Sequence, residues 1–317
     1  MTSTTTTAPV VPDPQGGRGR SARRRRSVQR RVPPVVWLFL LIPLAVEVFW
    51  VFWPAVNSFW LSTTSWKGIG AARPVGTANY ERLLSDPIFH TALWNNVLWV
   101  FGFGGLSVVG GLALAVALNR PRRFVGVYRT VIYLPMVISM AVTGLFWRIV
   151  YAPGGPVNSS LDILGLGHWQ KQWLADPDTA LAAVLVAAIW RQVGYIMVLY
   201  LAGLKGCDPS LDEAAAVDGA NAWQRFWQIT MPQLAGVNTV VFAITVIDSL
   251  RTFDIVWVMT RGGPYNQSQL LSTYMFEQAF SYVNLGYGSA IAVVIFALAI
   301  VFIITYVARQ AKAEEEL

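Results

Sequence analysis

Residues 212–234, DEAAAVDGANAWQRFWQITMPQL, form a polar and helix-prone segment that separates two long apolar runs. These runs cover residues 180–203 and 237–259. Each has about the ~20 residues that a helix needs to cross a hydrocarbon layer roughly 30 Å thick. Two questions therefore decide the fold: whether these runs lie in a membrane, and what function the polar segment between them has.

The composition of the whole chain indicates a membrane protein. Of its 317 residues, 55% are hydrophobic and only 13% are charged, and its mean hydropathy is +0.47. Because a soluble domain has about 25% charged residues, this chain has too few charges to cover a surface that faces water.

Six apolar runs approach the length of a membrane span. They lie at residues 35–58, 92–118, 129–151, 180–203, 237–259 and 286–308. A backbone in lipid must satisfy its own hydrogen bonds, and runs of this length without strict alternation favour helices over a closed barrel. The sequence predicts an all-α membrane protein with six transmembrane helices, within a domain at 35–309.

The distribution of basic residues predicts the orientation. With the N-terminus inside, sixteen of the 24 Lys and Arg residues fall on cytoplasmic segments and five on the opposite side. This asymmetry agrees with the positive-inside rule. We therefore expect both termini, including the acidic tail 310–317, and the loop 204–235 to be cytoplasmic.

The Arg-rich stretch before the first run is predicted to be a disordered tail, residues 1–34, because it has no apolar run to bury. Its charge is expected to orient the first span and to contact anionic membrane lipid. An RNA-binding arm and a twin-Arg export signal are the alternatives, and we expect no nucleic-acid partner. The apolar run that follows is too long for a signal-peptide core and should remain in the protein.

The sequence lacks the motifs of the common catalytic sites. A phosphate-binding P-loop needs Gly-Lys followed by Ser or Thr, and no Lys of this chain follows Gly. His90 and His168 are far apart, and Cys207 is the only cysteine, so no His/Cys cluster can bind a metal. We expect an absence of catalytic residues, metal and cofactor on this chain; any ATP and Mg²⁺ would be used by another subunit.

The segment 212–234 has the pattern of two helices with a joint. Acidic residues precede a run of Ala, as the helix dipole favours, and Asp208-Pro209-Ser210 supplies a cap. Beyond Gly219, a second segment is amphipathic until Pro232 breaks it, with the side chains of one face being Trp223, Phe226, Trp227 and Thr230. Such a pair either docks into a groove of a partner or rests its aromatic side chains on the membrane interface.

The order of residues in this segment is more specific than its periodicity. Glu213-Ala214-Ala215, three residues, Gly219, nine residues, then Ile229, Met231 and Pro232 resemble the EAA signature, E-A-A-x3-G-x9-I-x-L-P, of permease subunits in binding-protein-dependent ABC importers. The one departure is Met231 in place of Leu, which nearly conserves volume.

Other segments extend the resemblance from about residue 36 to 309. YLPMVISMAVTGLFWRIVY (133–151) and FDIVWVMTRGGPYNQSQLLSTYMFEQAF (253–280) are similar to segments of sugar permeases. The chain resembles a permease of the maltose-transporter type, in the carbohydrate-uptake branch with the MetI-like type I importer fold.

The resemblance implies a coupling helix between helices 4 and 5 that fits a groove on a dimer of ATP-binding cassette subunits. The coupling residues it implies are Glu213, Ala214, Ala215, Asp218, Gly219, Ile229 and Pro232. It also implies a second, homologous permease subunit, an extracytoplasmic solute-binding protein and a location in the bacterial plasma membrane. The outer segments expected to contact the binding protein are 59–91, 152–179 and 260–285.

Charged and aromatic residues inside the predicted spans are the candidates for a substrate pathway, since a charge at membrane depth must be paired or hydrated. They are Trp190, Arg191, Tyr195, Asp248, Arg251 and Asp254, with Gln192, Asn95 and Asn96 as further candidates. Asp248, Arg251 and Asp254 are spaced so that one helix can neutralise its own charges, which is the structural alternative. Gly262, Gly263 and Pro264 are expected to form an outer turn rather than to contact solute.

The predicted function is that of the transmembrane subunit of an ATP-driven importer of a sugar. A sugar-like solute, such as a polyol or glycerol phosphate, is the alternative. An ion-coupled secondary transporter would leave the segment 212–234 without a task and would often show an internal repeat that this sequence lacks.

Overall fold

The chain is helical in the computed structural model, which describes residues 34–121 and 123–315; the predicted tail 1–34 lies outside these residues except for Pro34. Within these ranges there is no β-strand, only an isolated bridge between Thr64 and Pro74. The chain divides into two units after Val51, and all packing described below lies in the second unit.

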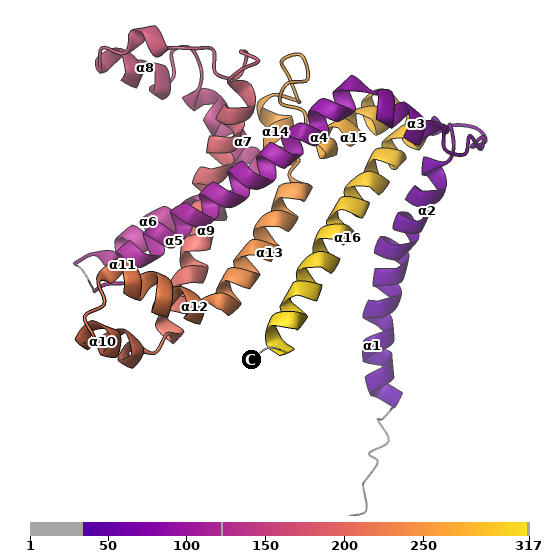
Figure 1. Cartoon of the computed structure of the whole chain (residues 1–317). Helices are drawn as coiled ribbons and strands as arrows, with labels where there is room; N and C mark the ends of the chain where they lie inside the picture. The colour runs from indigo at the N-terminus through magenta and orange to yellow at the C-terminus, as the bar shows by residue number, and fades with distance from the viewer. Residues whose placement is uncertain (1–33, 122, 316–317) are drawn as a thin grey trace, which may run out of the picture. The chain divides into compact units, whose positions relative to one another are not determined.

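The described residues form sixteen α-helices, which Figure 1 labels. They are α1 (Pro34–Glu47), α2 (Trp53–Ser62), α3 (Ala78–Ser85), α4 (Pro87–Trp99), α5 (Leu106–Leu118), α6 (Val125–Val137), α7 (Met140–Val150), α8 (Pro156–Ile163), α9 (Ala180–Gly206), α10 (Pro209–Val217), α11 (Ala222–Arg225), α12 (Met231–Gln233), α13 (Ala235–Arg251), α14 (Asp254–Met259), α15 (Leu271–Phe276) and α16 (Leu285–Glu315). Short π-helical segments join several of them, at Val48–Phe52, Val100–Gly105, Phe226–Thr230 and Glu277–Ser281. Most of the predicted tail 310–317 is helical, because α16 continues to Glu315.

Four continuous helical stretches are long and apolar enough to cross a membrane. They are Phe39–Ser62, Pro87–Leu118, Ala180–Gly206 and Leu285–Tyr306. Two bent pairs, Val125–Val137 with Met140–Val150 and Ala222–Gln233 with Ala235–Arg251, raise the number to six if each pair is one span.

The prediction of one straight span at 129–151 was wrong. α6 and α7 meet at an angle of 103°, and the break falls at Ile138 and Ser139, whose backbones are extended. Pro135 lies in the last turn of α6, and the hydroxyl of Ser139 accepts a hydrogen bond from the Val142 amide at 3.3 Å. A serine that caps the next helix therefore stabilises the break.

The apolar run 237–259 is also divided. α13 ends at Arg251 and α14 begins at Asp254, with Thr252 and Phe253 between them. Arg251 and Asp254 are therefore not neighbours on one helix, so the structural alternative, in which one helix neutralises its own charges, is limited to Asp248 and Arg251 on α13. The ion pairs among the described residues, Lys171–Asp176 and Arg225–Asp212, include none of these three charges.

The longest helix outside the terminal one, α9, forms much of the core. Its small buried residues Ala183, Ala187 and Ala188 pack against Trp99 and Phe103, which stack with ring centroids 6.0 Å apart. Small side chains on α9 thus leave room for the large aromatic side chains of the stretch α4–α5.

α9 and α6 approach each other closely at Gly194. A Cβ atom added to Gly194 would lie 2.1 Å from the backbone carbonyl oxygen of Ile132. Gly194→Ala should therefore push α6 away from α9 and lower the free energy of unfolding by about 1–3 kcal/mol. The thermal unfolding midpoint of the purified protein measures this effect. Gly126→Ala on α6, where the added Cβ meets nothing within 4 Å, is the matched control and should leave the midpoint nearly unchanged.

One polar network ties together the starts of α4 and α16 and helix α15. The carboxylate of Asp86 caps α4 and accepts hydrogen bonds from the hydroxyls of Tyr274 and Tyr287, and the guanidinium of Arg82 lies 4.0 Å from the Tyr287 ring centroid. Burial raises the pKa of Asp86, but hydrogen bonds from the two tyrosines and from the backbone outweigh it, so the pKa is below its usual value.

The long helices of the second unit have two distinct ends. Figure 1 shows α8, α15 and the loop after α14 at one end, which we name the α8 end, and α10, α11 and α12 at the other, the α10 end. The predicted outer segments and the predicted coupling segment therefore lie at opposite ends of these helices.

Candidate functional site

A polar pocket lies where the two helix breaks meet. Its volume is about 310 Å³, and its lining residues are Met136, Met140, Arg191, Gln192, Asp248, Arg251, Thr252, Phe253, Asp254 and Ile255. They come from the α6–α7 break, the middle of α9 and the α13–α14 break. The structure thus brings together four of the six residues predicted for the substrate pathway.

Arg191 is bound to the α6–α7 break. Its Nε donates to the carbonyl oxygen of Ile138 at 2.9 Å, and one terminal nitrogen donates to that of Met136 at 3.3 Å. These carbonyls lie where the helix stops, so they have no partner in the next turn of α6. Arg191 therefore stabilises the break, and part of the hydrogen-bonding capacity of its guanidinium has a structural role.

Asp248 has free hydrogen-bonding capacity. Among the described residues, its side chain accepts one hydrogen bond, from Gln192 Nε2 at 3.2 Å, while the Asp248 backbone carbonyl accepts from the Thr252 hydroxyl at 2.8 Å. A carboxylate has about four acceptor positions. The remaining positions are available to a ligand in the pocket.

The pocket has the chemistry of a site for a polar solute. Its volume is at the low end of the roughly 300–1,000 Å³ typical of small-molecule sites. Carboxylates and an amide can bind hydroxyl groups, and the half-buried Phe253 supplies an aromatic face. Interrupted helices at membrane depth are tolerated where the freed backbone is buried in protein or lines a polar cavity, which is the arrangement here.

The other substrate candidates lie elsewhere. Trp190 lines a separate apolar cavity of about 460 Å³ and stacks on Phe146 at 5.8 Å, and Tyr195 packs in the apolar cluster around α5. The amide of Asn95 donates to the carbonyls of Gln267 and Gln269, and Asn96 accepts from the Leu271 amide. The amides of the two asparagines therefore join α4 to the segment before α15.

The segment at the α10 end begins with a well-capped helix. Asp208 caps α10 by accepting from the Ser210 amide at 2.9 Å, and Pro209 occupies the first turn. The helix ends at Val217, and Gly219, just beyond the C-cap residue Asp218, has a φ of +87°. The amide of Gly219 donates to the carbonyl of Ala216, and that of Ala220 donates to that of Ala215. This pair of bonds is the Schellman motif, which favours glycine at the left-handed position.

The second part of the segment is folded back on α10. Asn221 and Gln224 form a reciprocal capping box that starts α11. Arg225 then pairs with Asp212 at 3.3 Å, and the Asp208 amide donates to Gln233 at 2.8 Å. These contacts hold α10 and α11–α12 as one unit at the α10 end.

Most of the predicted coupling residues are accessible on this unit. Glu213, Ala214, Asp218, Gly219 and Pro232 are exposed, whereas the side chains of Ala215 and Ile229 are half-buried. In the described part of the chain, Glu213 has no ion-pair partner.

The break predicted at Pro232 lies close to the bend in the structure. The helical stretch continues one residue beyond Pro232, to Gln233, and bends by 74° into α13. Because proline has no amide hydrogen, Pro232 cannot donate the helical hydrogen bond to the preceding turn, and the helix ends soon after it.

The Gly262–Pro264 stretch forms a compact loop at the α8 end. The φ of Gly262 is +82°, and the Gly263–Pro264 peptide is cis. The Ser268 hydroxyl donates to the Gly263 carbonyl at 2.6 Å, and the Gly263 amide donates to the Thr260 carbonyl at 3.0 Å. These bonds fix a turn, and nothing in them requires a solute.

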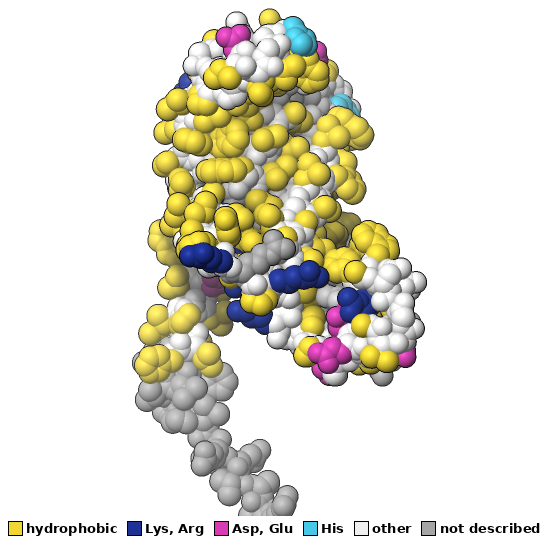
Figure 2. All heavy atoms as spheres, turned by 90° about the vertical axis from the view of Figure 1, so that its left-hand side faces the viewer, with side chains coloured by type: hydrophobic (Ala, Val, Ile, Leu, Met, Phe, Trp, Pro, Cys, Tyr) yellow, Lys and Arg dark blue, Asp and Glu magenta, His cyan; other side chains and the backbone are white. Residues whose placement is uncertain are grey.

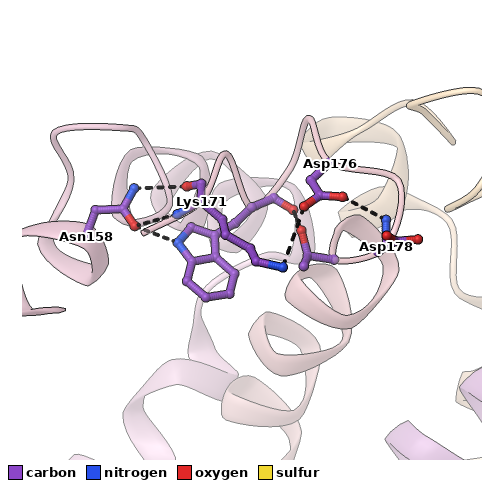
Figure 3. Close-up of polar contacts among 6 residues, drawn as sticks. Asn158, Lys171, Asp176 and Asp178 are labelled. Carbon is purple, nitrogen blue, oxygen red and sulfur yellow. Dashed lines mark hydrogen bonds and ion pairs between the residues drawn. The ribbon is translucent and has the colours of Figure 1, made fainter. Parts of the chain in front are cut away.

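A folded lobe, residues 152–179, extends from the same end. Figure 3 shows Asn158 beside Lys171: the side-chain amide of Asn158 donates to the Lys171 carbonyl at 3.0 Å, and its side-chain oxygen accepts from the Trp173 indole at 2.9 Å. Lys171 also pairs with Asp176 at 3.8 Å. The buried Asn158 on α8 therefore holds the segment around Lys171 and Trp173 against this helix, so the lobe has a defined surface.

Three of these features were missed in the sequence. The capping box had a readable signal, Asn221 followed three residues later by Gln224. Ser139 after Pro135 was a comparable signal for the α6–α7 break. Phe253 had none, because its place in the pocket depends on where α13 stops.

Comparison with known proteins agrees with this architecture. Residues 107–312 match the family model described as the binding-protein-dependent transport system inner membrane component. A probable ABC transporter permease protein of Pyrococcus horikoshii is 37% identical over 90% of this chain and 99% of its own length. The lactose transport system permease protein LacF of Rhizobium radiobacter is 33% identical over 91% of this chain and 98% of its own.

A solved structure shares the fold. A bacterial ABC transporter involved in the import of the acidic polysaccharide alginate superposes with a TM-score of 0.75 at 21% identity, over 88% of this chain and 95% of that chain. The chain belongs to the family of binding-protein-dependent transport system inner membrane components and is an integral membrane permease subunit of an ABC transporter.

Proposed function

We propose that this chain is the transmembrane subunit of an importer that receives a sugar from an extracytoplasmic binding protein and passes it inward by alternating access. The observation that carries the proposal is its near-full-length similarity to a lactose permease, LacF. The pocket of Arg191, Gln192 and Asp248 supports the same solute class, because it offers acceptors and donors for hydroxyl groups.

The proposed domain is residues 35–309, with six membrane-crossing segments in which each bent helix pair counts as one. Both termini and the α10 end face the cytoplasm of a bacterial cell in this proposal. The excess of Lys and Arg on the corresponding segments supports the orientation.

We assign ATP hydrolysis to a separate dimer of ATP-binding cassette subunits that the 208–234 unit contacts. The exposed and unpaired Glu213 and the small side chain of Ala214 support this assignment, because a helix enters a groove closely only where its side chains are short. A second, homologous permease would complete the pathway, and the lobe 152–179 is a surface for the binding protein at the α8 end.

The test is the ATPase activity of the complex that co-purifies through a tag on this chain. The complex is reconstituted in lipid with its binding protein and a panel of mono- and oligosaccharides, with a polyol and glycerol phosphate as controls. Stimulation by a sugar, and not by the controls, is the expected result.

Two results would contradict the proposal in different ways. Stimulation by a polyol or by glycerol phosphate alone would replace the sugar while keeping the importer. Uptake that follows an imposed ion gradient and needs no co-purified ATPase would overturn the ABC mechanism itself.

A further inference from the structure

A second pocket, separate from the polar one, lies at the α10 end between α5 and the 208–234 unit. Its volume is about 750 Å³. One wall is apolar and consists of Val109, Leu112, Ala113 and Val116 of α5 together with Leu204, Trp223, Phe226 and Trp227. The mouth is polar and includes Asn119, Arg120 and Arg225. The pocket is therefore amphipathic along its length.

The apolar wall is continuous with the surface of a candidate membrane span. Val109 is 66% exposed and Val116 is 39% exposed on α5, in the span Pro87–Leu118, and Trp223 is 70% exposed. Figure 2 shows the broad hydrophobic surface above, Lys and Arg side chains along its lower edge, and a projection with Asp and Glu side chains at the α10 end below. The pocket thus begins at the depth of acyl chains and ends at the depth of headgroups.

The mouth has two basic and two acidic residues, and one of the basic residues has no partner. Asp212 pairs with Arg225, and Asp208 is held at the N-terminus of α10. In contrast, Arg120 has no ion pair among the described residues. An anionic headgroup would complement this charge.

A second observation points to a missing acceptor. The Nε of Arg225 is buried and has no hydrogen-bond partner in the part of the chain that the structure describes. A buried donor without a partner is costly, by about 1–3 kcal/mol. A phosphate oxygen in the pocket could accept from it, since arginine binds phosphate through several N–H groups.

We propose that this pocket binds an anionic phospholipid, with one acyl chain between α5 and Trp223, Phe226 and Trp227, and with the phosphate at Arg120 and Arg225. The lipid braces the 208–234 unit against α5. This inference does not require that a sugar is the solute or that the unit couples to an ATPase.

Native mass spectrometry of the complete complex, released from mild detergent, tests the proposal. The wild-type complex should retain one phosphatidylglycerol per copy of this chain and bind it about tenfold or more tightly than phosphatidylethanolamine. Ala113→Phe fills the apolar wall and Arg120→Gln removes the headgroup contact, so each should abolish the retained lipid.

Matched controls come from the same helix and loop. Ala117 is exposed on α5 and Arg123 lies in the following loop, and neither lines the pocket; Ala117→Phe and Arg123→Gln should keep the lipid. Equal retention in Ala113→Phe, Arg120→Gln and wild type would overturn the site, and equal binding of phosphatidylethanolamine would overturn the anionic headgroup. If Ala113→Phe instead releases a partner subunit while the lipid count stays constant, a polypeptide covers the pocket and the proposal is wrong.

Discussion

Gly219→Pro and Glu213→Lys are each expected to leave the chain inserted in the membrane and to abolish uptake of the solute. Neither residue lies in a candidate span, so insertion should be normal. Their shared effect would place the coupling of transport to ATP hydrolysis in the 208–234 unit.

The backbone at Gly219 explains the first expectation. Its φ is +87°, and its amide donates to the Ala216 carbonyl at 3.2 Å. Proline holds φ near −65° and has no amide hydrogen, so Gly219→Pro removes the Schellman motif and changes the angle between α10 and α11. Gly219→Asn is the matched control, because Asn tolerates the left-handed conformation, and it should retain most of the uptake.

The exposure of Glu213 explains the expected effect of Glu213→Lys. Its carboxylate has no ion-pair partner among the described residues, which is the condition expected of a charge that pairs across an interface. Loss of such a pair typically costs about 2–5 kcal/mol, which is at least about 30-fold in affinity. Asp212→Asn is the matched control: it removes an adjacent charge whose partner is the internal Arg225, and it should affect stability more than subunit binding.

Solute-dependent uptake into vesicles and the amount of ATPase subunit that co-purifies measure both variants. Glu213→Lys should lose the ATPase subunit, whereas Gly219→Pro should lose uptake even where some subunit remains bound. Normal uptake in both variants would show that the 208–234 unit has no part in coupling.

The sequence predicts the helical class and the position of most helices because both depend on local properties. A long apolar run must be helical in lipid whatever surrounds it, and the caps at Asp208 and Gly219 depend only on neighbouring residues. Local properties do not show which residues far apart in the sequence come together in one pocket. The break at Thr252 and Phe253 falls among Asp248, Arg251 and Asp254, but charged residues within an apolar run do not by themselves show where a helix ends.

The polar pocket shows the same limit in detail. Arg191, Asp248, Arg251 and Asp254 were found because a charge at membrane depth is conspicuous. Trp190 was included for its aromatic face, yet it lies next to Arg191 on α9 and lines another cavity. Adjacent residues on a helix point about 100° apart, so membership in one site depends on the packing of α9 against α6 and α13, which hydropathy does not report.

Asp248→Asn is expected to produce an assembled complex that requires a much higher solute concentration. Asparagine has nearly the same shape and can still accept the hydrogen bond from Gln192. The pocket would lose the charge that strengthens a bond to a solute hydroxyl. Hydrogen bonds to charged groups are worth about 1.5–3 kcal/mol, so the half-saturating solute concentration should rise about 10- to 150-fold.

Arg191→Leu in the same pocket should lower the assembly of the complex instead of changing its solute dependence. It leaves the carbonyls of Met136 and Ile138 without their donor, and each unsatisfied buried group costs about 1–3 kcal/mol. The α6–α7 break should therefore loosen, and the yield of assembled complex should fall. Assembly is measured by co-purification and solute dependence by uptake, so the two readouts separate the roles of Arg191 and Asp248.

If Asp248→Asn instead prevents assembly while the solute dependence of any remaining complex is unchanged, Asp248 is a structural residue, and the solute pathway must be sought away from this pocket.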